Sequence, residues 1–227
     1  TGNLDPRLDW TVGRRGVPYH DWGNHPGRDW IREVTYGGPY SPKKNTYFKS
    51  EEGATGGKVD WGFASNSLNY TMMRYADVLL MAAEAEIEAA GGSLATARTY
   101  INMVRTRAGA NAPSNSGTFA QPAASATYAT YNVGLYGAFA DQAAARKAVR
   151  FERKLELGME GHRFFDLVRW GIAATELNSY LSVEGVRRPT TLQGTTFVAG
   201  KHEYYPVPTA IITASNVGGT TIITQNT

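Results

Sequence analysis

The clearest hydrophobic pattern along the chain lies between residues 69 and 90. Apolar side chains recur there at steps of three and four residues, which is the spacing of one face of an α-helix. The positions on this face are Met73, Ala76, Leu80, Ala83 and Ile87. Gly91 and Gly92 follow, and glycine favours the end of a helix. The pattern therefore predicts a helix over residues 69–90.

A second apolar stripe occupies residues 94–108 and is made of Leu94, Ala97, Ile101, Val104 and Ala108. Ser93 is a favourable N-cap for this helix, and Gly109 follows its end. Because only a Gly-Gly-Ser turn joins the two helices, we expect them to lie antiparallel, as a tetratricopeptide-like helical hairpin. No second copy of such a repeat is visible, and a single hairpin cannot bury its apolar face alone. Partner helices beyond this chain are therefore expected.

Helical spacing returns between residues 139 and 158. The side chains expected on its apolar face are Ala144, Ala148, Phe151, Leu155 and Met159. Gly161 interrupts the pattern, and two further helical stretches are predicted over residues 162–170 and 172–181.

The rest of the chain lacks a helical period. Residues 1–67 are rich in glycine, proline and aromatic residues and are expected to form loops and turns. Residues 110–137 form a long insertion rich in alanine, serine and threonine, and residues 182–227 form an irregular tail with a β-rich composition. The predicted fold is mainly α, with helical hairpins, a loop-rich face and little β-structure.

Composition narrows the possible functions. The chain has no cysteine, which excludes disulfides, thiolate metal sites and a cysteine nucleophile. Its formal net charge is only +3 and its basic residues are interspersed with acids, so we expect no nucleic-acid ligand. The chain contains no run of about 18 apolar residues, which is the length that a membrane-spanning helix requires. Since the chain opens on Thr1 in a sequence typical of a protein's interior, we expect its N-terminal half, with any lipid anchor, to lie upstream.

Three glutamates in the third helical region resemble catalytic carboxylates. Glu152, Glu156 and Glu160 recur at steps of four, and paired carboxylates can perform the acid–base work of a glycoside hydrolase. The same spacing also suits a structural charge network. Arg153, Arg163 and Arg169 are the expected partners in such a network, and we favour this second interpretation.

Other chemistry has little support in the sequence. His20 and His25 lie near Asp21 and Asp29, but their spacing fits no standard pattern of metal ligands, and we expect no metal. No fingerprint of a nucleotide-binding loop or of a serine nucleophile is present. We therefore expect no cofactor and no catalytic residue.

Several motifs together resemble the C-terminal half of the SusD/RagB family. They are Asp5–Leu8, Arg74–Met81, Ala83–Ala85, Tyr100–Asn102, Val104–Gly109, Glu152–Leu157, Glu160–Leu167, Arg169–Gly171, Tyr205–Pro208 and Gln225–Asn226. They follow the family's order and are spread over nearly the whole chain, so the resemblance is more specific than any one motif.

The resemblance implies a cell-surface protein that binds glycans and performs no chemistry. It implies tetratricopeptide-like hairpins that support a loop-rich binding face, and a lipid anchor that holds the parent protein on the outer membrane. It also implies docking onto a TonB-dependent transporter barrel (SusC-like) that takes up the ligand. The segment that contains Glu152 and Glu160 is then part of the family's scaffold.

The loop-rich segment supplies side chains suited to sugars. Pyranose rings stack on aromatic faces, while planar polar groups hydrogen-bond the hydroxyl groups. The residues predicted to bind the ligand are Trp22, Trp30, Tyr36, Tyr40 and Trp61, with Arg28 and Asn45 as polar partners. Trp10 and Trp170 are assigned to packing.

Two other functions remain open at this point. In the first, the aromatic rings are buried and the chain is a protein–protein docking module without a ligand of its own. In the second, the glutamates meet in a cleft and the chain is a glycoside hydrolase. Exposed loop aromatics favour glycan binding, and buried ones favour docking.

Overall fold

The computed structural model describes residues 4–53, 56–58, 64–66, 68–109, 129 and 131–225, with the backbone alone for residues 56–58 and 64–66. Trp61 and most of the insertion expected at residues 110–137, namely 110–128 and 130, lie outside the described residues. The chain forms two compact units, Thr1–Gly161 and His162–Thr227, which are taken one at a time below.

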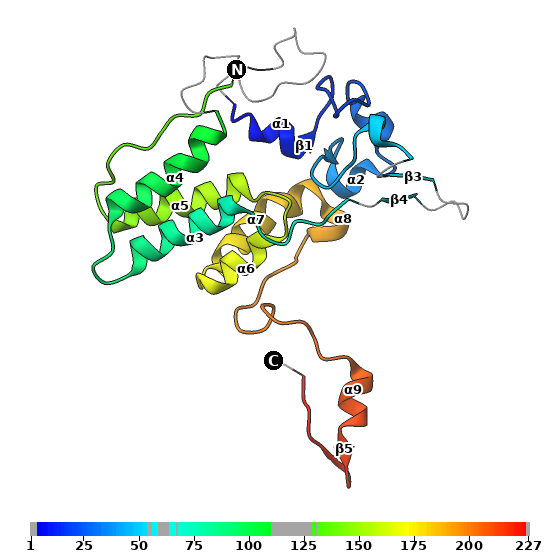
Figure 1. Cartoon of the computed structure of the whole chain (residues 1–227). Coiled ribbons are helices and arrows are strands. Elements are labelled where there is room, and N and C mark those ends of the chain that lie inside the picture. The colour runs from blue at the N-terminus through cyan, green and yellow to red at the C-terminus, as the bar shows by residue number, and fades with distance from the viewer. Residues whose placement is uncertain are drawn as a thin grey trace. The chain divides into compact units, whose positions relative to one another are not determined.

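Three helices form the main core of the first unit: α3 (Tyr75–Glu88), α4 (Leu94–Arg107) and α5 (Gln142–Glu156). Each packs against the other two (Figure 1). Their buried side chains are Leu79, Leu80, Ala83, Ile87, Ala97, Ile101, Val104, Ala145 and Val149. This confirms the predicted antiparallel hairpin, and it shows that α5 covers the face that the hairpin cannot bury alone.

Local chemistry sets the ends of these helices. The first helix ends at Glu88 with Ala89 as its C-cap, so the prediction that Gly91 and Gly92 cap it is wrong. Gly91 lies two residues beyond the cap, in the turn, with a φ of 81°, a left-handed conformation that glycine adopts without strain. The Ser93 hydroxyl accepts a hydrogen bond from the Thr96 amide at 3.2 Å, which caps α4 as predicted. The first helix begins at Tyr75 and not at residue 69, so Met73 lies before it and is 63% exposed. The prediction that Met73 belongs to the apolar stripe is therefore wrong.

The apolar face predicted for α5 is also wrong in part. Ala148 is buried, but Phe151 is 50% and Met159 53% exposed. The buried face runs from Ala145 and Val149 into charged residues, since Glu152, Arg153 and Glu156 are all buried. Apolar periodicity predicts Phe151 on the buried face, because a charged residue such as Glu152 is expected at the surface.

Short elements make up the loop-rich part of the first unit. They are α1 (Arg7–Thr11), β1 (Val12–Gly13), η1 (Gly27–Trp30), α2 (Val34–Gly37), β2 (Ser41–Pro42), η2 (Lys49–Glu51), β3 (Gly56–Lys58) and β4 (Ala64–Asn66). β1 pairs antiparallel with β2, and β3 with β4. A small apolar cluster of Val17 and Tyr131, with Trp10 packed against it, anchors this region, so Trp10 has the packing role predicted for it.

The second unit contains α6 (His162–Arg169), α7 (Ala173–Arg187), α8 (Pro189–Leu192), α9 (Thr209–Ala214), β5 (Asn216–Val217) and β6 (Thr220–Thr221). The helix expected over residues 172–181 runs on to Arg187, and the tail holds two short helices and one two-residue hairpin. The described residues are thus mainly helical, as predicted. None of their helices has the length and hydropathy that crossing a bilayer requires.

Candidate functional site

The loop-rich part of the first unit is organised around a buried lysine. Lys43 is 1% exposed, and its ammonium group donates hydrogen bonds of 2.8 Å to the carbonyl oxygens of Asp9 and Pro18. The same Nζ lies 5.6 Å from the centroid of the Trp10 ring. Burial lowers the pKa of Lys43 to about 8, although the carboxylate of Asp9 opposes this effect. Lys43 therefore ties the segment after β2 to α1.

A buried aspartate completes this connection. Asp9 has no exposed surface, and its two carboxylate oxygens accept hydrogen bonds from Nε and Nη2 of Arg14 at 2.5 and 2.8 Å. The hydroxyl of Tyr131 donates to Asp9 as well, at 2.5 Å. Burial, followed by this interaction with the carboxylate, raises the pKa of Tyr131. Polar side chains thus hold together a region with few buried apolar side chains.

His20 and His25 make further hydrogen-bond contacts within the loop-rich part of the first unit. Nδ1 of His25 accepts a hydrogen bond from the Gly27 amide at 2.9 Å, so its proton resides on Nε2, which faces the Ser41 hydroxyl at 2.9 Å. Nε2 of His20 lies 3.2 Å from the Lys43 carbonyl oxygen, and its Nδ1 is buried without a partner among the described residues. Burial lowers the pKa of both rings. No group of three or more metal-ligating side chains occurs in the part of the chain that the structure describes.

Exposed aromatic rings lie on the surface of this region. Trp30 is 46% exposed, Tyr36 70% and Tyr40 56%. The Trp30 ring is not loose, because edge contacts with Tyr19 and His25 hold it at centroid distances of 5.6 and 5.1 Å. η1 carries both Trp30 and the exposed Arg28, and α2 carries Tyr36. These four predicted site residues therefore present accessible side chains.

The other predicted site residues differ from these. Trp22 is partly buried, and its indole N–H donates to the Tyr47 carbonyl oxygen at 3.1 Å. Asn45 is exposed, has a φ of 62°, and lines a pocket in the first unit. Trp61 lies outside the described residues, so the structure places six of the seven predicted side chains.

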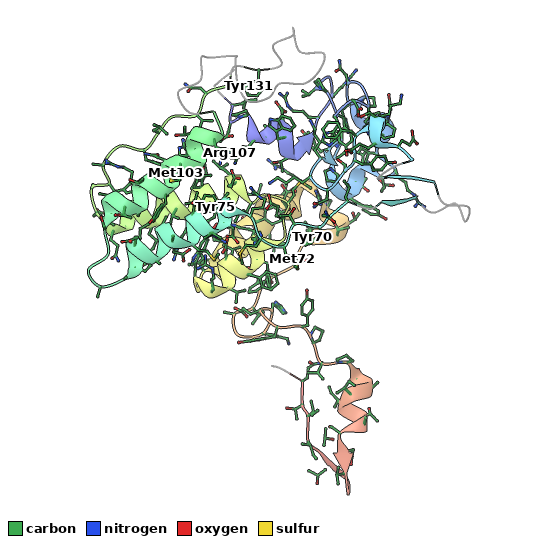
Figure 2. All side chains as sticks on the ribbon, in the orientation of Figure 1. Tyr70, Met72, Tyr75, Met103, Arg107 and Tyr131 are labelled. Atoms are coloured by element: carbon green, nitrogen blue, oxygen red, sulfur yellow. The ribbon has the colours of Figure 1, made fainter. Side chains whose placement is uncertain are left out.

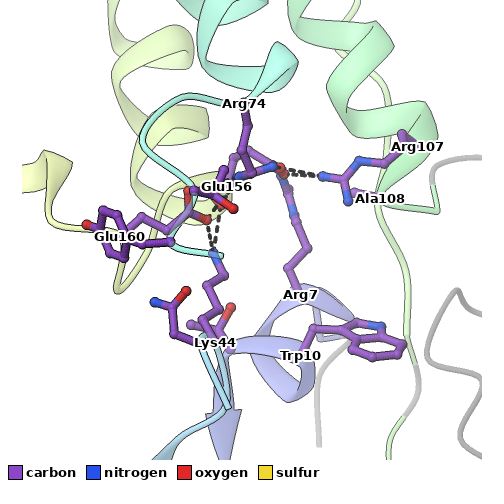
Figure 3. A pocket seen from close by; sticks show the side chains of 12 residues that line it. Arg7, Trp10, Lys44, Arg74, Arg107, Ala108, Glu156 and Glu160 are labelled. Carbon is purple, nitrogen blue, oxygen red and sulfur yellow. Dashed lines mark hydrogen bonds and ion pairs between the residues drawn. The ribbon is translucent and has the colours of Figure 1, made fainter. Parts of the chain in front are cut away.

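The pocket that Asn45 lines has a volume of about 500 Å³ (Figure 3). Its walls come from α1, the turn after β2, the segment before α3, the end of α4 and the end of α5. The lining residues are Arg7, Trp10, Thr11, Lys44, Asn45, Tyr70, Thr71, Arg74, Arg107, Ala108, Glu156 and Glu160. Segments far apart in sequence thus meet around the two glutamates.

Glu156 is the centre of this arrangement. It is 3% exposed, and Arg7 at 3.0 Å, Arg74 at 2.9 Å and Arg107 at 2.5 Å all bind its carboxylate. Figure 3 shows these three side chains converging on it from different elements. Four cation–carboxylate contacts of 2.6–2.9 Å continue the network on either side: Arg7–Glu152, Arg105–Glu152, Arg74–Glu160 and Lys44–Glu160.

This geometry supports the structural interpretation of the glutamates. Burial opposes the ionisation of Glu160, but hydrogen bonds from Arg74 and Lys44 outweigh burial and lower its pKa. A general acid needs a raised pKa and an available proton, whereas each of these carboxylates faces at least two cations. The charge network predicted for Glu152, Glu156 and Glu160 is present.

The predicted partners in that network were wrong. Arg153 pairs with Asp77 at 2.7 Å, while Arg163 and Arg169 lie in the second unit. There they pair with Glu176 at 3.6 Å and Asp166 at 2.9 Å. The actual partners are Arg7, Lys44, Arg74, Arg105 and Arg107. The buried Glu152 and Glu156 on α5 require cations from the elements that pack against this helix. The sequence pattern does not indicate which elements those are.

Comparison with known proteins agrees with this scaffold. A SusD-like protein of Formosa agariphila is 41% identical over 109 residues, which make up 48% of this chain and 16% of that protein. A SusD superfamily structure from Bacteroides vulgatus matches 92% of the chain, with a TM-score of 0.58 and 24% identity. A SusD homologue from Bacteroides thetaiotaomicron matches 98%, with a TM-score of 0.57 and 25% identity.

The chain spans only part of these relatives, namely 37% and 40% of the two solved chains. The sequence profile of the SusD family matches residues 1–226, which is nearly the whole chain. Proteins of this family are binding proteins without catalytic activity. On the extent of that match, the chain belongs to the SusD family.

Proposed function

We propose that this chain is part of a cell-surface protein that binds glycans and delivers them to a TonB-dependent transporter barrel. Membership of the SusD family supports the class of function, because these proteins are surface lipoproteins of the outer membrane. A lipid on the parent protein would hold it there. The observation that carries the proposal is the exposure of Trp30, Tyr36 and Tyr40 on the loop-rich face.

The proposed mechanism is stacking with hydrogen bonding and no covalent step. The C–H faces of a pyranose ring pack on the exposed aromatic faces, and the nearby Arg28 guanidinium donates to hydroxyl groups. Trp30 is the best-supported platform, because its contacts with Tyr19 and His25 fix the ring before a ligand arrives. Trp22 and Trp61 extend the proposed surface, and Asn45 contributes from the rim of the pocket.

Calorimetric titration of the chain against a panel of soluble oligosaccharides and polysaccharides tests this proposal. We expect saturable binding that falls about fivefold in Trp30→Ala or Tyr36→Ala, since a stacked ring contributes on the order of 1 kcal/mol. Tyr180→Ala is the matched control, because Tyr180 is similarly exposed at 52% but lies on α7 in the second unit. No binding by the folded chain across a broad panel would refute glycan capture.

A docking surface is a second, compatible function, and exposed apolar residues before and at the start of α3 favour it. Met72 is 83%, Met73 63% and Tyr75 70% exposed, and Figure 2 shows Met72 and Tyr75 on this part of the first unit. Flexible methionines and an adjacent ring suit a protein partner. Co-purification of the transporter with the parent protein should weaken in Met72→Ser/Tyr75→Ser while glycan binding persists. Unchanged co-purification would exclude this surface.

A further inference from the structure

The pocket in the first unit carries an excess of positive charge. Four of its lining side chains are cationic, namely Arg7, Lys44, Arg74 and Arg107, whereas Glu156 and Glu160 are its two carboxylates. Asp5 and Glu152 also bind Arg7 from outside the lining, and Arg105 binds Glu152. Five cations therefore face four carboxylates in this cluster of described residues. One positive charge remains uncompensated.

The excess charge is located at the accessible end of the network. Arg7, at 8% side-chain exposure, uses Nε, Nη1 and Nη2 on Asp5, Glu152 and Glu156. Arg107 differs, because its side chain is 59% exposed and only Nη2 contacts Glu156. Its Nε and Nη1 have no partner among the described residues. Arg107 is the last residue of α4 (Figure 2), and its side chain lines the pocket.

A second cation has spare donor capacity beside the carboxylates. The ammonium of Lys44 donates to the Glu156 carbonyl oxygen at 3.0 Å and to the Glu160 carboxylate at 2.6 Å, which leaves one of its three protons. In Figure 3 Lys44 and Arg107 approach the carboxylates from different sides. The network fixes both cations in place before a ligand binds, so little ordering remains to be done.

The remaining walls suit a sugar ring. Trp10 and Tyr70 both line the pocket, and Tyr70 is 66% exposed. The hydroxyl groups of Thr11 and Thr71 and the amide of Asn45 add neutral polar groups around them. The volume of about 500 Å³ lies within the usual range for ligand pockets, roughly 300–1,000 Å³.

We propose that this pocket binds an anionic sugar unit, one that bears a carboxylate or a sulfate group. Arg107 and Lys44 donate to the anionic group, and Trp10 and Tyr70 contact the ring. The exposed aromatics Trp30, Tyr36 and Tyr40 do not line this pocket, whereas Asn45 does. That the ligand is a sugar rests on the proposed glycan-binding function. That the ligand is anionic rests on the uncompensated positive charge of the pocket.

Calorimetry with three trisaccharides tests the inference on the 227-residue chain: a galacturonic acid trisaccharide, a sulfated trisaccharide and a neutral galactose trisaccharide. We expect at least one acidic ligand to bind about tenfold more tightly than the neutral one, with the preference reduced by added salt. Arg107→Gln should remove most of this preference. Arg146→Gln is the matched control, because Arg146 on α5 also forms an accessible pair with a glutamate, Glu88 on α3, and neither residue lines the pocket.

Thermal melting checks whether Arg107→Gln remains folded. Tyr70→Ala is a second variant, which changes the pocket wall and leaves the ion network unchanged. Tyr70→Ala should lower the affinity for the acidic trisaccharide severalfold. Equal affinity for acidic and neutral trisaccharides, or an unchanged preference in Arg107→Gln, would overturn the inference. Acidic ligands that depend on Trp30 but not on Arg107 would overturn it and leave glycan binding intact. If no saccharide binds, both proposals fail.

Discussion

At the scale of single residues, this protein depends on buried charges that are fully paired. Glu152, Glu156, Arg7 and Asp9 are all buried in the first unit, and each meets opposite charges or hydrogen-bond partners from distant segments. Burying a charge costs several kcal/mol unless good geometry offsets that cost. Removing one partner from such a network therefore lowers the stability of the fold, because the remaining charges stay buried without an opposite charge.

Glu156→Gln should be the most destabilising single change in this network. It leaves three arginines, Arg7, Arg74 and Arg107, without the carboxylate that they share. We expect a loss of roughly 3–5 kcal/mol in the free energy of unfolding, measured by urea denaturation. Glu88→Gln is the control, because it removes a single accessible pair with Arg146 and should change stability little. Equal effects of the two substitutions would contradict a central role for Glu156.

At the scale of elements, the tight turn between α3 and α4 fixes the hairpin. Gly91 has a φ of 81°, and Gly92 lies so close to α3 that an added Cβ would meet the Glu86 carbonyl oxygen at 2.0 Å. The two glycines are thus required for different reasons. The first supplies a left-handed conformation, and the second allows a close approach of backbone to backbone.

Gly92→Ala should therefore destabilise the chain more than Gly91→Ala. The clash at residue 92 is with backbone atoms, which cannot move aside as a flexible side chain can. At residue 91 no atom lies within 4 Å of an added Cβ, so the cost is the left-handed conformation alone, roughly 1 kcal/mol. Chemical denaturation of both variants measures the difference. The reverse order would show that the turn relaxes around residue 92.

The hydrophobic pattern predicts where helices form, but it does not predict which charged side chains form ion pairs. Leu80, Ala83, Ile101 and Val104 follow helical spacing and are buried, so the hairpin was visible in the sequence. The apolar pattern predicts Phe151 in the core, yet Phe151 is exposed and the neighbouring Glu152 occupies the buried position.

The candidate site was less predictable for the same reason. Aromatic residues in a loop-rich segment indicate a region, but the exposure of Trp30 and the partial burial of Trp22 depend on tertiary contacts. The pocket brings together residues 7, 44, 107 and 156 from segments far apart in the chain. Pairs at such separations have no periodic signature, so only the folded chain reveals them.

At the scale of the whole molecule, the buried titratable groups give stability a dependence on pH. The pKa values of His20 and His25 are lowered, mainly by burial, and hydrogen bonds to cations lower that of Glu160 against the opposing effect of burial. A group whose pKa is lowered on folding binds protons more readily in the unfolded chain. Stability should therefore decrease as pH falls below about 6.5 through the histidines, and again below about 4.5 through the carboxylates.

Lys43 extends this dependence to alkaline pH. Its pKa falls from 10.5 to about 8 on folding, so between these values the unfolded chain binds more protons and stability rises with pH. The rise should total about 2–3 kcal/mol in urea denaturation from pH 7.5 to 10.5, before the titration of tyrosines opposes it. Lys43→Met should remove the rise, while Lys147→Met, a substitution of an exposed lysine on α5, should retain it. If both variants keep the wild-type slope, another group titrates in this window and Lys43 stays charged on its two carbonyl partners.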